Sequence, residues 1–73
     1  MPKSIYSKEY KNVIKKLKKA RFDAGLKQRD VVLKLKKPQS YISKIERGER
    51  RVDIIELKEL AVIYKKPIDF FLK

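Results

Sequence analysis

The chain of 73 residues contains no cysteine and no histidine. Without cysteine it forms neither disulfides nor thiolate metal sites, and without histidine it lacks the commonest general base and metal ligand. Its two glycines, Gly25 and Gly48, are too few for a glycine-rich phosphate loop. No apolar run approaches the ~20 residues of a membrane span, and the N-terminus has no apolar signal core. We therefore expect a soluble, cytoplasmic protein with no cofactor and no membrane association.

The acidic side chains show no spacing suited to a metal-binding loop or to a catalytic pair of carboxylates. Most stand where helix caps and helix-surface charges are expected. The sequence therefore predicts no enzymatic activity and no metal site. A chain of this length forms one domain that buries only about 60% of its unfolded surface, so dimerisation would supplement its stability.

Positive charge is abundant and unevenly distributed. The net charge is +12, with 13 basic and 3 acidic side chains in residues 1–37 and four of each in residues 53–73. Such a charge favours polyanionic partners. It also fits a lysine-rich or heat-adapted composition, or binding of the basic first helix to anionic lipid. The small residues on the apolar side of that helix favour packing inside a bundle over lipid binding.

Helix signals divide the chain into an N-terminal tail, residues 1–6, and one domain, residues 7–73. Ser7 is placed to cap a first helix that ends at Gly25. A second helix is expected over 28–35 and a third over about 38–47, ending at Gly48. The pattern of Asp53 and Glu56 predicts a capping box at the start of a fourth helix, and a last helical turn is expected over 68–72. Because no strand alternation appears, we predict an all-α, compact five-helix bundle.

The third of these helices has two different faces. At 100° per residue, Ile42 and Ile45 lie within about 60° of each other and define a buried side. The opposite side is polar, and Gln39 lies at its N-terminal edge; its members are Ser40, Ser43, Lys44 and Arg47. The DNA major groove admits such a helix, and these side-chain types pair with base edges. A polar, solvated surface helix would have the same pattern.

The surrounding residues resemble the lambda-repressor/Cro-like (XRE-type) helix-turn-helix family. The likeness covers residues 13–72 with element spacing intact, and its centre is the segment from Pro38 to Arg51. Matching positions outside that segment are Leu17, Ala20, Arg21, Ala24, Gly25, Leu26, Gln28, Val31, Leu35, Asp53, Leu57, Leu60, Ala61, Asp69, Phe70, Phe71 and Leu72. The resemblance implies a helix-turn-helix fold that binds double-stranded DNA.

The resemblance also implies roles for individual residues. The base-reading side chains would be Gln39, Ser40, Ser43 and Lys44. The side chains on the DNA backbone would be Gln28, which would also brace Gln39, together with Tyr41, Arg47, Arg50 and Arg51; such contacts position the protein without specifying sequence. Arg21 and Glu46 would form a buried ion pair, with a phosphate contact as the alternative role for Arg21.

Three positions depart from the family pattern. Lys36 stands where the family has glycine, so a left-handed conformation there would be strained. Val32 replaces a usual alanine, and Leu33 is apolar at a usually polar position. We expect a slightly wider helix crossing or a covered patch there.

The neutral C-terminus carries more apolar side chains than one small core readily buries, so it is the expected homodimer surface. Its members are Ile68, Phe70, Phe71 and Leu72. Core closure by one or two of them is the alternative. In a dimer, two reading helices would address half-sites roughly 34 Å apart on a near-palindromic operator.

Together these features predict a dimeric transcriptional repressor or autoregulator, with no small-molecule effector evident. The alternative is an antitoxin or co-regulator whose main role is protein–protein interaction. The two differ in whether the outer face of the third helix matters for DNA binding.

Overall fold

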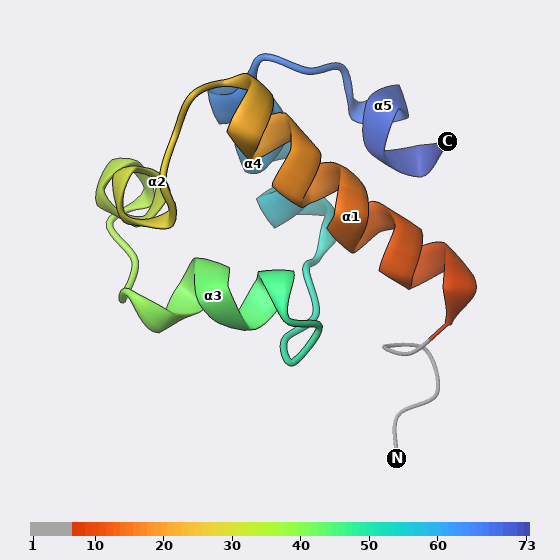
Figure 1. The fold of residues 1–73 in the computed structure, drawn as a ribbon, viewed down its shortest axis with the longest axis horizontal. Coiled ribbons are helices and arrows are strands. Elements are labelled where there is room, and N and C mark those ends of the chain that lie inside the picture. The colour runs from red at the N-terminus through yellow and green to blue at the C-terminus, as the bar shows by residue number, and fades with distance from the viewer. Residues whose placement is uncertain (1–6) are drawn as a thin grey trace.

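The computed structural model describes residues 7–73, which form five helices (Figure 1). The helices are α1 (Lys8–Asp23), α2 (Gln28–Leu35), α3 (Ser40–Glu46), α4 (Ile54–Tyr64) and α5 (Ile68–Leu72). No strand occurs in this part of the chain, and the predicted all-α, five-helix fold is confirmed. Within residues 7–73 no helix combines the length and the apolar character needed to cross a membrane. The expected N-terminal tail, residues 1–6, lies outside the described residues.

Side-chain caps set the starts of α1 and α4, as the sequence predicts. The Ser7 hydroxyl accepts a 3.1 Å hydrogen bond from the Tyr10 N–H at the start of α1. At the start of α4, the Glu56 N–H donates to Asp53 at 2.8 Å, and the Asp53 N–H donates to Glu56 at 3.1 Å. Each bond satisfies a backbone donor that the first turn of a helix leaves unpaired.

Two helices end at lysines in the left-handed region, where glycine is the usual residue. Lys36 after α2 has φ 57° and Lys65 after α4 has φ 59°. The predicted left-handed strain at Lys36 is confirmed, and Lys65 repeats it at the second Lys-Lys-Pro segment. In both turns the next N–H reaches back to a carbonyl at 3.0 Å: Lys37 to Val32, and Lys66 to Ala61. These backbone hydrogen bonds at the helix ends offset the strain of the left-handed conformation.

The third helix is shorter than the range 38–47 predicts. Pro38 and Gln39 form a turn in which the Tyr41 N–H donates to the Pro38 carbonyl at 3.0 Å. Gly48, at φ 76°, follows the helix, and the Glu49 N–H closes it on Lys44 at 2.9 Å. Gln39 therefore stands before the first turn of α3 and not within it.

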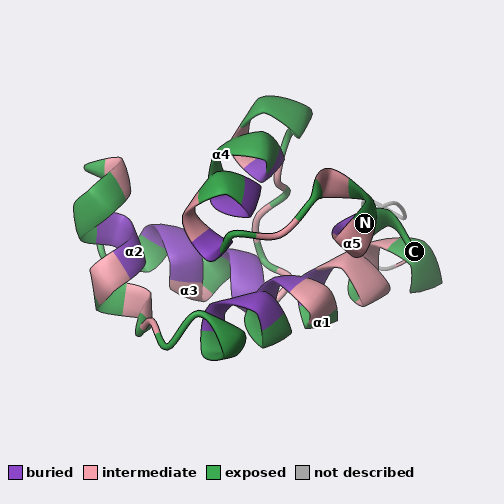
Figure 2. Cartoon of the chain, turned by 90° about the horizontal axis from the view of Figure 1, so that it is seen from above, coloured by how far each residue is buried: buried purple, intermediate pink, exposed green. Residues whose placement is uncertain are grey.

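The core lies between α1 and the remaining helices, with α1 packed against α3, α4 and α5 and with α2 packed against α3. Figure 2 shows the buried residues concentrated on the inward faces of these helices. The buried cluster comprises Leu17, Ala20, Val31, Val32, Tyr41, Ile42, Ile45, Leu57, Leu60, Ala61, Tyr64 and Phe71. Burial on this scale is the main source of stability, and it fixes α3 with its opposite face outward.

The expected dimer surface at the C-terminus is corrected at one residue, Phe71. Its side chain is 0% exposed and packs edge-to-face on Phe70, with the ring centroids 5.2 Å apart. Ile68 and Phe70 are half-buried against the core, and only Leu72 is largely exposed. Phe71 thus belongs to the hydrophobic core, and the alternative of core closure describes this segment better.

Candidate nucleic-acid interface

A buried ion pair joins α1 to α3. Arg21 Nε donates to Glu46 Oε2 at 2.7 Å and Nη2 donates to Oε1 at 3.1 Å. Arg21 also donates to the Leu26 carbonyl at 2.9 Å, so one guanidinium holds the turn before α2 as well. The hydrogen bonds to Glu46 raise the pKa of Arg21. Because Nε, Nη1 and Nη2 of Arg21 each donate a hydrogen bond inside the domain, the geometry supports a structural role for Arg21 over a phosphate contact.

Gln28, the first residue of α2, joins the same network. Its Nε2 donates to Glu46 Oε1 at 2.9 Å. This bond directs the Gln28 amide to Glu46, and no hydrogen bond joins Gln28 to Gln39 within residues 7–73. Gln28 links α2 to α3 directly, and its half-buried position keeps part of the side chain at the surface.

The outer face of α3 brings together the residues expected to read bases. Its inner face is closed by Tyr41, Ile42, Ile45 and Glu46, which are all buried. Ser40 and Lys44 are exposed, as is Gln39 in the preceding turn. Ser43 is half-buried and its hydroxyl donates to the Ser40 carbonyl at 3.2 Å. Hydrogen-bonding groups of several kinds thus share one accessible helix face.

Tyr41 does not offer its hydroxyl to solvent. The side chain is 5% exposed, and its hydroxyl has no hydrogen-bond partner within residues 7–73. Burial raises the pKa of Tyr41 to about 12. Two cations lie over the ring, with Lys37 Nζ 5.3 Å and the Arg50 guanidinium 4.7 Å from its centroid. The expected phosphate contact by Tyr41 is therefore corrected: the ring supports neighbouring cations instead.

Arg50 is bound within the domain beside Tyr41. Its two terminal nitrogens each lie 3.0 Å from a carboxylate oxygen of Glu56. These hydrogen bonds raise the pKa of Arg50 and lower the pKa of Glu56. The bidentate pair ties the turn after α3 to the first turn of α4. The local pattern predicts only the capping role of Glu56, so this second role was missed from the sequence.

The other two arginines near α3 are more accessible. Arg47 pairs with Glu49 at 3.0 Å, but both side chains are more than half exposed. An exposed pair of this kind contributes little and exchanges partners readily. Arg51 is exposed in the turn before α4. Both guanidinium groups are therefore accessible to an incoming anion.

A cationic hollow borders the N-terminal half of α3. It has a volume of about 280 Å³ and is lined by Lys37, Pro38, Ser40, Tyr41, Lys44 and Arg50. Three of these side chains are cationic, and the Tyr41 ring forms an apolar wall. We refer to it as the first hollow. Its charge and position beside the outer face of α3 suit a phosphate group.

Tyr10 fixes the turn that carries these arginines, a role that the sequence did not predict. The Val52 N–H donates to the Tyr10 hydroxyl oxygen at 2.7 Å, and that hydroxyl donates to the Arg50 carbonyl at 3.3 Å. Burial raises the pKa of Tyr10. In the sequence, Tyr10 is one apolar position of the first helix, and no local pattern distinguishes its hydroxyl. The contact joins residues 40 or more apart.

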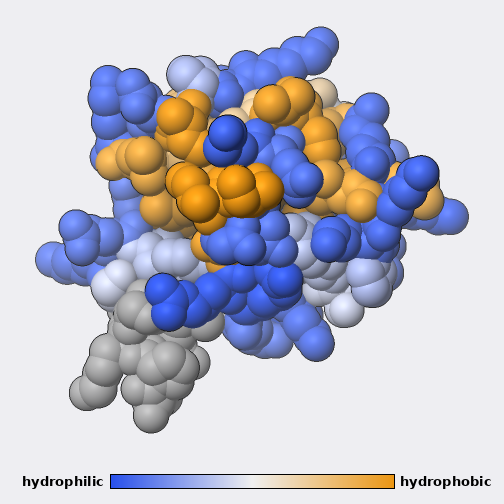
Figure 3. Space-filling model, turned by 180° about the vertical axis from the view of Figure 1, so that it is seen from behind, coloured by the Kyte–Doolittle hydropathy of each residue, from blue (hydrophilic) through white to orange (hydrophobic). Residues whose placement is uncertain are grey.

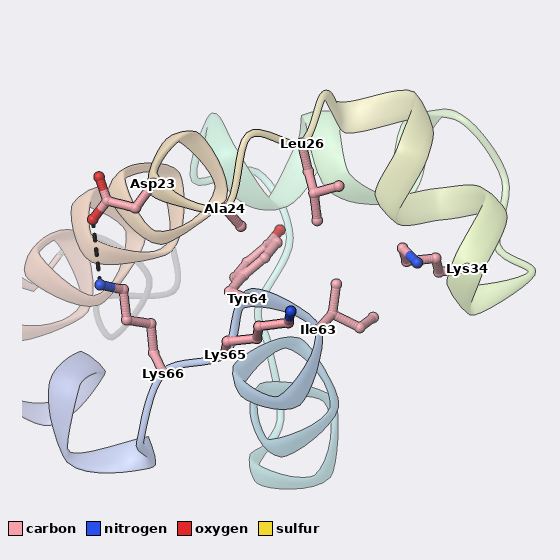
Figure 4. A pocket seen from close by; sticks show the side chains of 8 residues that line it. All are labelled: Asp23, Ala24, Leu26, Lys34, Ile63, Tyr64, Lys65 and Lys66. Atoms are coloured by element: carbon pink, nitrogen blue, oxygen red, sulfur yellow. Dashed lines mark ion pairs between the residues drawn. The ribbon is translucent and has the colours of Figure 1, made fainter.

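A further hollow lies away from α3 (Figure 4). Its volume is about 380 Å³, and its lining comes from the end of α1, from Leu26 and α2, and from the end of α4 with its following turn. Lys66 bridges to Asp23 across its rim at 3.4 Å, while Tyr64 and Ile63 supply apolar surface. Since no residue of α3 lines it, this hollow is separate from the candidate interface.

Comparison with known proteins agrees with this geometry. A family model described as helix-turn-helix matches residues 17–71, which include the C-terminal half of α1, all of α2, α3 and α4, and most of α5. No curated protein and no solved structure gives a significant match.

Proposed function

The chain belongs to the lambda-repressor/Cro-like (XRE-type) helix-turn-helix family of DNA-binding transcription regulators, and we propose that it reads a specific duplex sequence through α3. The observation that carries the proposal is the division of α3 into two faces. Its inner face is fixed by core packing and by the Arg21–Glu46 pair, while its outer face presents accessible polar side chains. A rigid helix of this kind suits the major groove.

The side chains of the outer face match the chemistry of base edges. Gln39 suits a bidentate pair with adenine, and Lys44 suits donation to O6 and N7 of guanine. Ser40 and Ser43 donate to or accept from either type of base. Each good bidentate pair contributes ~1–3 kcal/mol of discrimination, so Gln39 and Lys44 are the main candidates for sequence preference.

Phosphate contacts would come from the cations around α3. The first hollow, which the base-reading Lys44 also lines, holds Lys37 and Arg50 around one opening. Arg47 and Arg51 are exposed. Gln28 is half-buried at the start of α2, and we assign it a phosphate contact as well. These contacts set the register of the protein on DNA and carry no sequence information directly.

We assign homodimerisation to the outer face of α4. Ile55 and Val62 are 59% and 77% exposed, and their spacing of seven residues puts them about 20° apart on the helix. Apolar side chains gather on the side of the molecule seen in Figure 3, opposite to the view of Figure 1. Residues 53–73 carry no net charge. Two molecules of charge +12 approach with least repulsion through this part, and their α3 helices would then read two half-sites.

In this arrangement the protein would act as a repressor or autoregulator by occupying a near-palindromic operator. A second candidate function is that of an antitoxin or co-regulator. The same exposed side chains, Ile55 and Val62, favour it, because another protein would bury them equally well. DNA binding that survives simultaneous Ser40→Ala, Ser43→Ala and Lys44→Ala substitution would favour that second function.

Selection of bound duplexes from a random-sequence pool, at two salt concentrations, tests the proposal. We expect an inverted repeat whose half-sites are one helical turn apart, recovered at both salt concentrations. A flat preference would contradict sequence-specific regulation, because phosphate contacts alone give salt-sensitive binding without base preference.

A further inference from the structure

A second cationic hollow lies on the other side of α3, between that helix and α1. It has a volume of about 290 Å³ and is lined by Lys11, Ile14, Lys15, Lys18, Glu46, Arg47 and Gly48. Its floor is apolar, because Ile14 is buried beside Gly48. A Cβ atom added to Gly48 would lie 3.5 Å from Cδ1 of Ile14. Four cationic side chains surround this floor.

Five of the six lysines of α1 fall into two groups. Lys16 lies over the Phe70 ring at 5.6 Å, and Lys19 pairs with Asp23 at 3.6 Å. The second group is Lys11, Lys15 and Lys18, which we call the α1 flank. On a helix, Lys11 and Lys18 are about 20° apart with Lys15 within about 60° of both. All three are exposed, and no carboxylate within residues 7–73 forms an ion pair with them.

The one acidic residue in the lining does not neutralise this charge. The Glu46 side chain is 4% exposed, and its oxygens accept from Arg21 and Gln28. Its negative charge is therefore balanced inside the domain. The three lysines of the α1 flank thus give the hollow an excess of positive charge, while Arg47 pairs with the exposed Glu49.

The second hollow is continuous with the outer face of α3 through Arg47. Arg47 follows that helix and also lines the hollow. Lys44, which lines the first hollow, is about 60° from Arg47 around the helix axis. α1 packs against α3 and shares the lining of this hollow with the end of α3 and the turn after it. The two hollows therefore flank α3.

We propose that the α1 flank binds phosphates of the duplex, on the opposite side of α3 from the first hollow. This inference rests on the proposed function. A helix in the major groove has a phosphate strand along each edge of a groove ≈12 Å wide, so an α3 flanked by two cationic hollows faces both strands. The α1 flank then adds affinity and orients the domain, while base preference stays with Gln39 and Lys44.

A charge-matched comparison tests this assignment. The test variant is Lys11→Gln/Lys15→Gln/Lys18→Gln, and the control is Lys34→Gln/Lys65→Gln/Lys73→Gln, whose three lysines are exposed and line neither hollow beside α3. Fluorescence anisotropy on the selected duplex over a salt series gives the dependence of the association constant on salt. Because each lost phosphate contact lowers the slope by ~0.9, we expect a decrease of about 2–3 for each bound protomer of the test variant, with unchanged base preference.

Two comparisons separate the possible outcomes. A Lys→Arg triple variant at the same three positions keeps the charge, and its slope should equal that of the parent chain. If the parent chain selects a sharp site but the test and control variants have equal slopes, the α1 flank does not bind phosphates. The proposed function is unaffected by that result. A parent with no sequence preference would contradict the proposed function and this inference with it.

Discussion

The guanidinium of Arg21 on α1 and the carboxylate of Glu46 on α3 are joined by two hydrogen bonds of 2.7 and 3.1 Å, and both side chains are almost closed to solvent. Removing one partner leaves a buried charge without its counter-charge, which costs about 3–5 kcal/mol. We expect Glu46→Ala to lower the free energy of unfolding by this amount in urea denaturation. The double variant Arg21→Met/Glu46→Leu should lose much less. A smaller loss for the single than for the double variant would contradict the buried-pair account.

The left-handed lysines should be sites of stabilisation. Lys36→Gly and Lys65→Gly relieve strain at φ values of 57° and 59°, and each should raise the free energy of unfolding by about 1 kcal/mol. Lys34→Gly is the matched control, because it places glycine inside α2 and should destabilise by about 1 kcal/mol. If Lys36→Gly and Lys34→Gly change the free energy of unfolding in the same direction, relief of strain at Lys36 is ruled out.

Glu56 should make part of the stability depend on acid pH. Hydrogen bonds from Arg50 lower the pKa of Glu56 from 4.5, so the folded state favours the ionised carboxylate. This contribution is present above pH 4.5 and is lost as the pH falls through the lowered pKa of the folded state. Glu56→Gln should therefore flatten the dependence of the free energy of unfolding on pH below about pH 5.

Glu59→Gln is the control for this measurement, because Glu59 is an exposed glutamate on the same helix. In this variant the free energy of unfolding should depend on pH as steeply as in the parent chain. If Glu56→Gln kept the same steepness as the parent, the pair with Arg50 would not contribute to acid stability.

Val62→Asp tests the dimer surface on α4. Val62 is 77% exposed, so a charge there should leave the fold intact while opposing burial against a second copy. Sedimentation should give a dimer for the parent and a monomer for Val62→Asp. Leu33→Asp, which alters a similarly exposed residue on α2, should stay dimeric. Equal masses for the parent and Val62→Asp would exclude this surface.

Local sequence patterns predict most of the helix boundaries. Ser7 and the Asp53–Glu56 pattern act within four residues, and glycine or Lys-Lys-Pro segments stop the helices where the backbone turns left-handed. These signals depend on neighbouring residues alone, so they can be recognised without the fold. The outward position of Lys44 and the inward positions of Ile42 and Ile45 follow from helical periodicity in the same way.

Tertiary contacts are less predictable. In a helix of five residues, periodicity does not decide whether Phe70 or Phe71 faces inward, and the structure buries Phe71 completely. Tyr10 bonds to a turn 40 residues away, and Arg50 meets Glu56 only because the chain turns back between α3 and α4. Such pairings are set by how the helices pack, which no local pattern contains.

Gln39→Ala tests whether α3 reads bases through its outer face. Gln39 is exposed and no part of the core, so its removal should leave the fold unchanged. Repeating the selection from random duplex DNA with Gln39→Ala should relax the preference at one position of each half-site while the other positions persist, at ~1–3 kcal/mol per lost bidentate pair. An unchanged selected site would contradict base reading by Gln39 and with it the proposed role of α3.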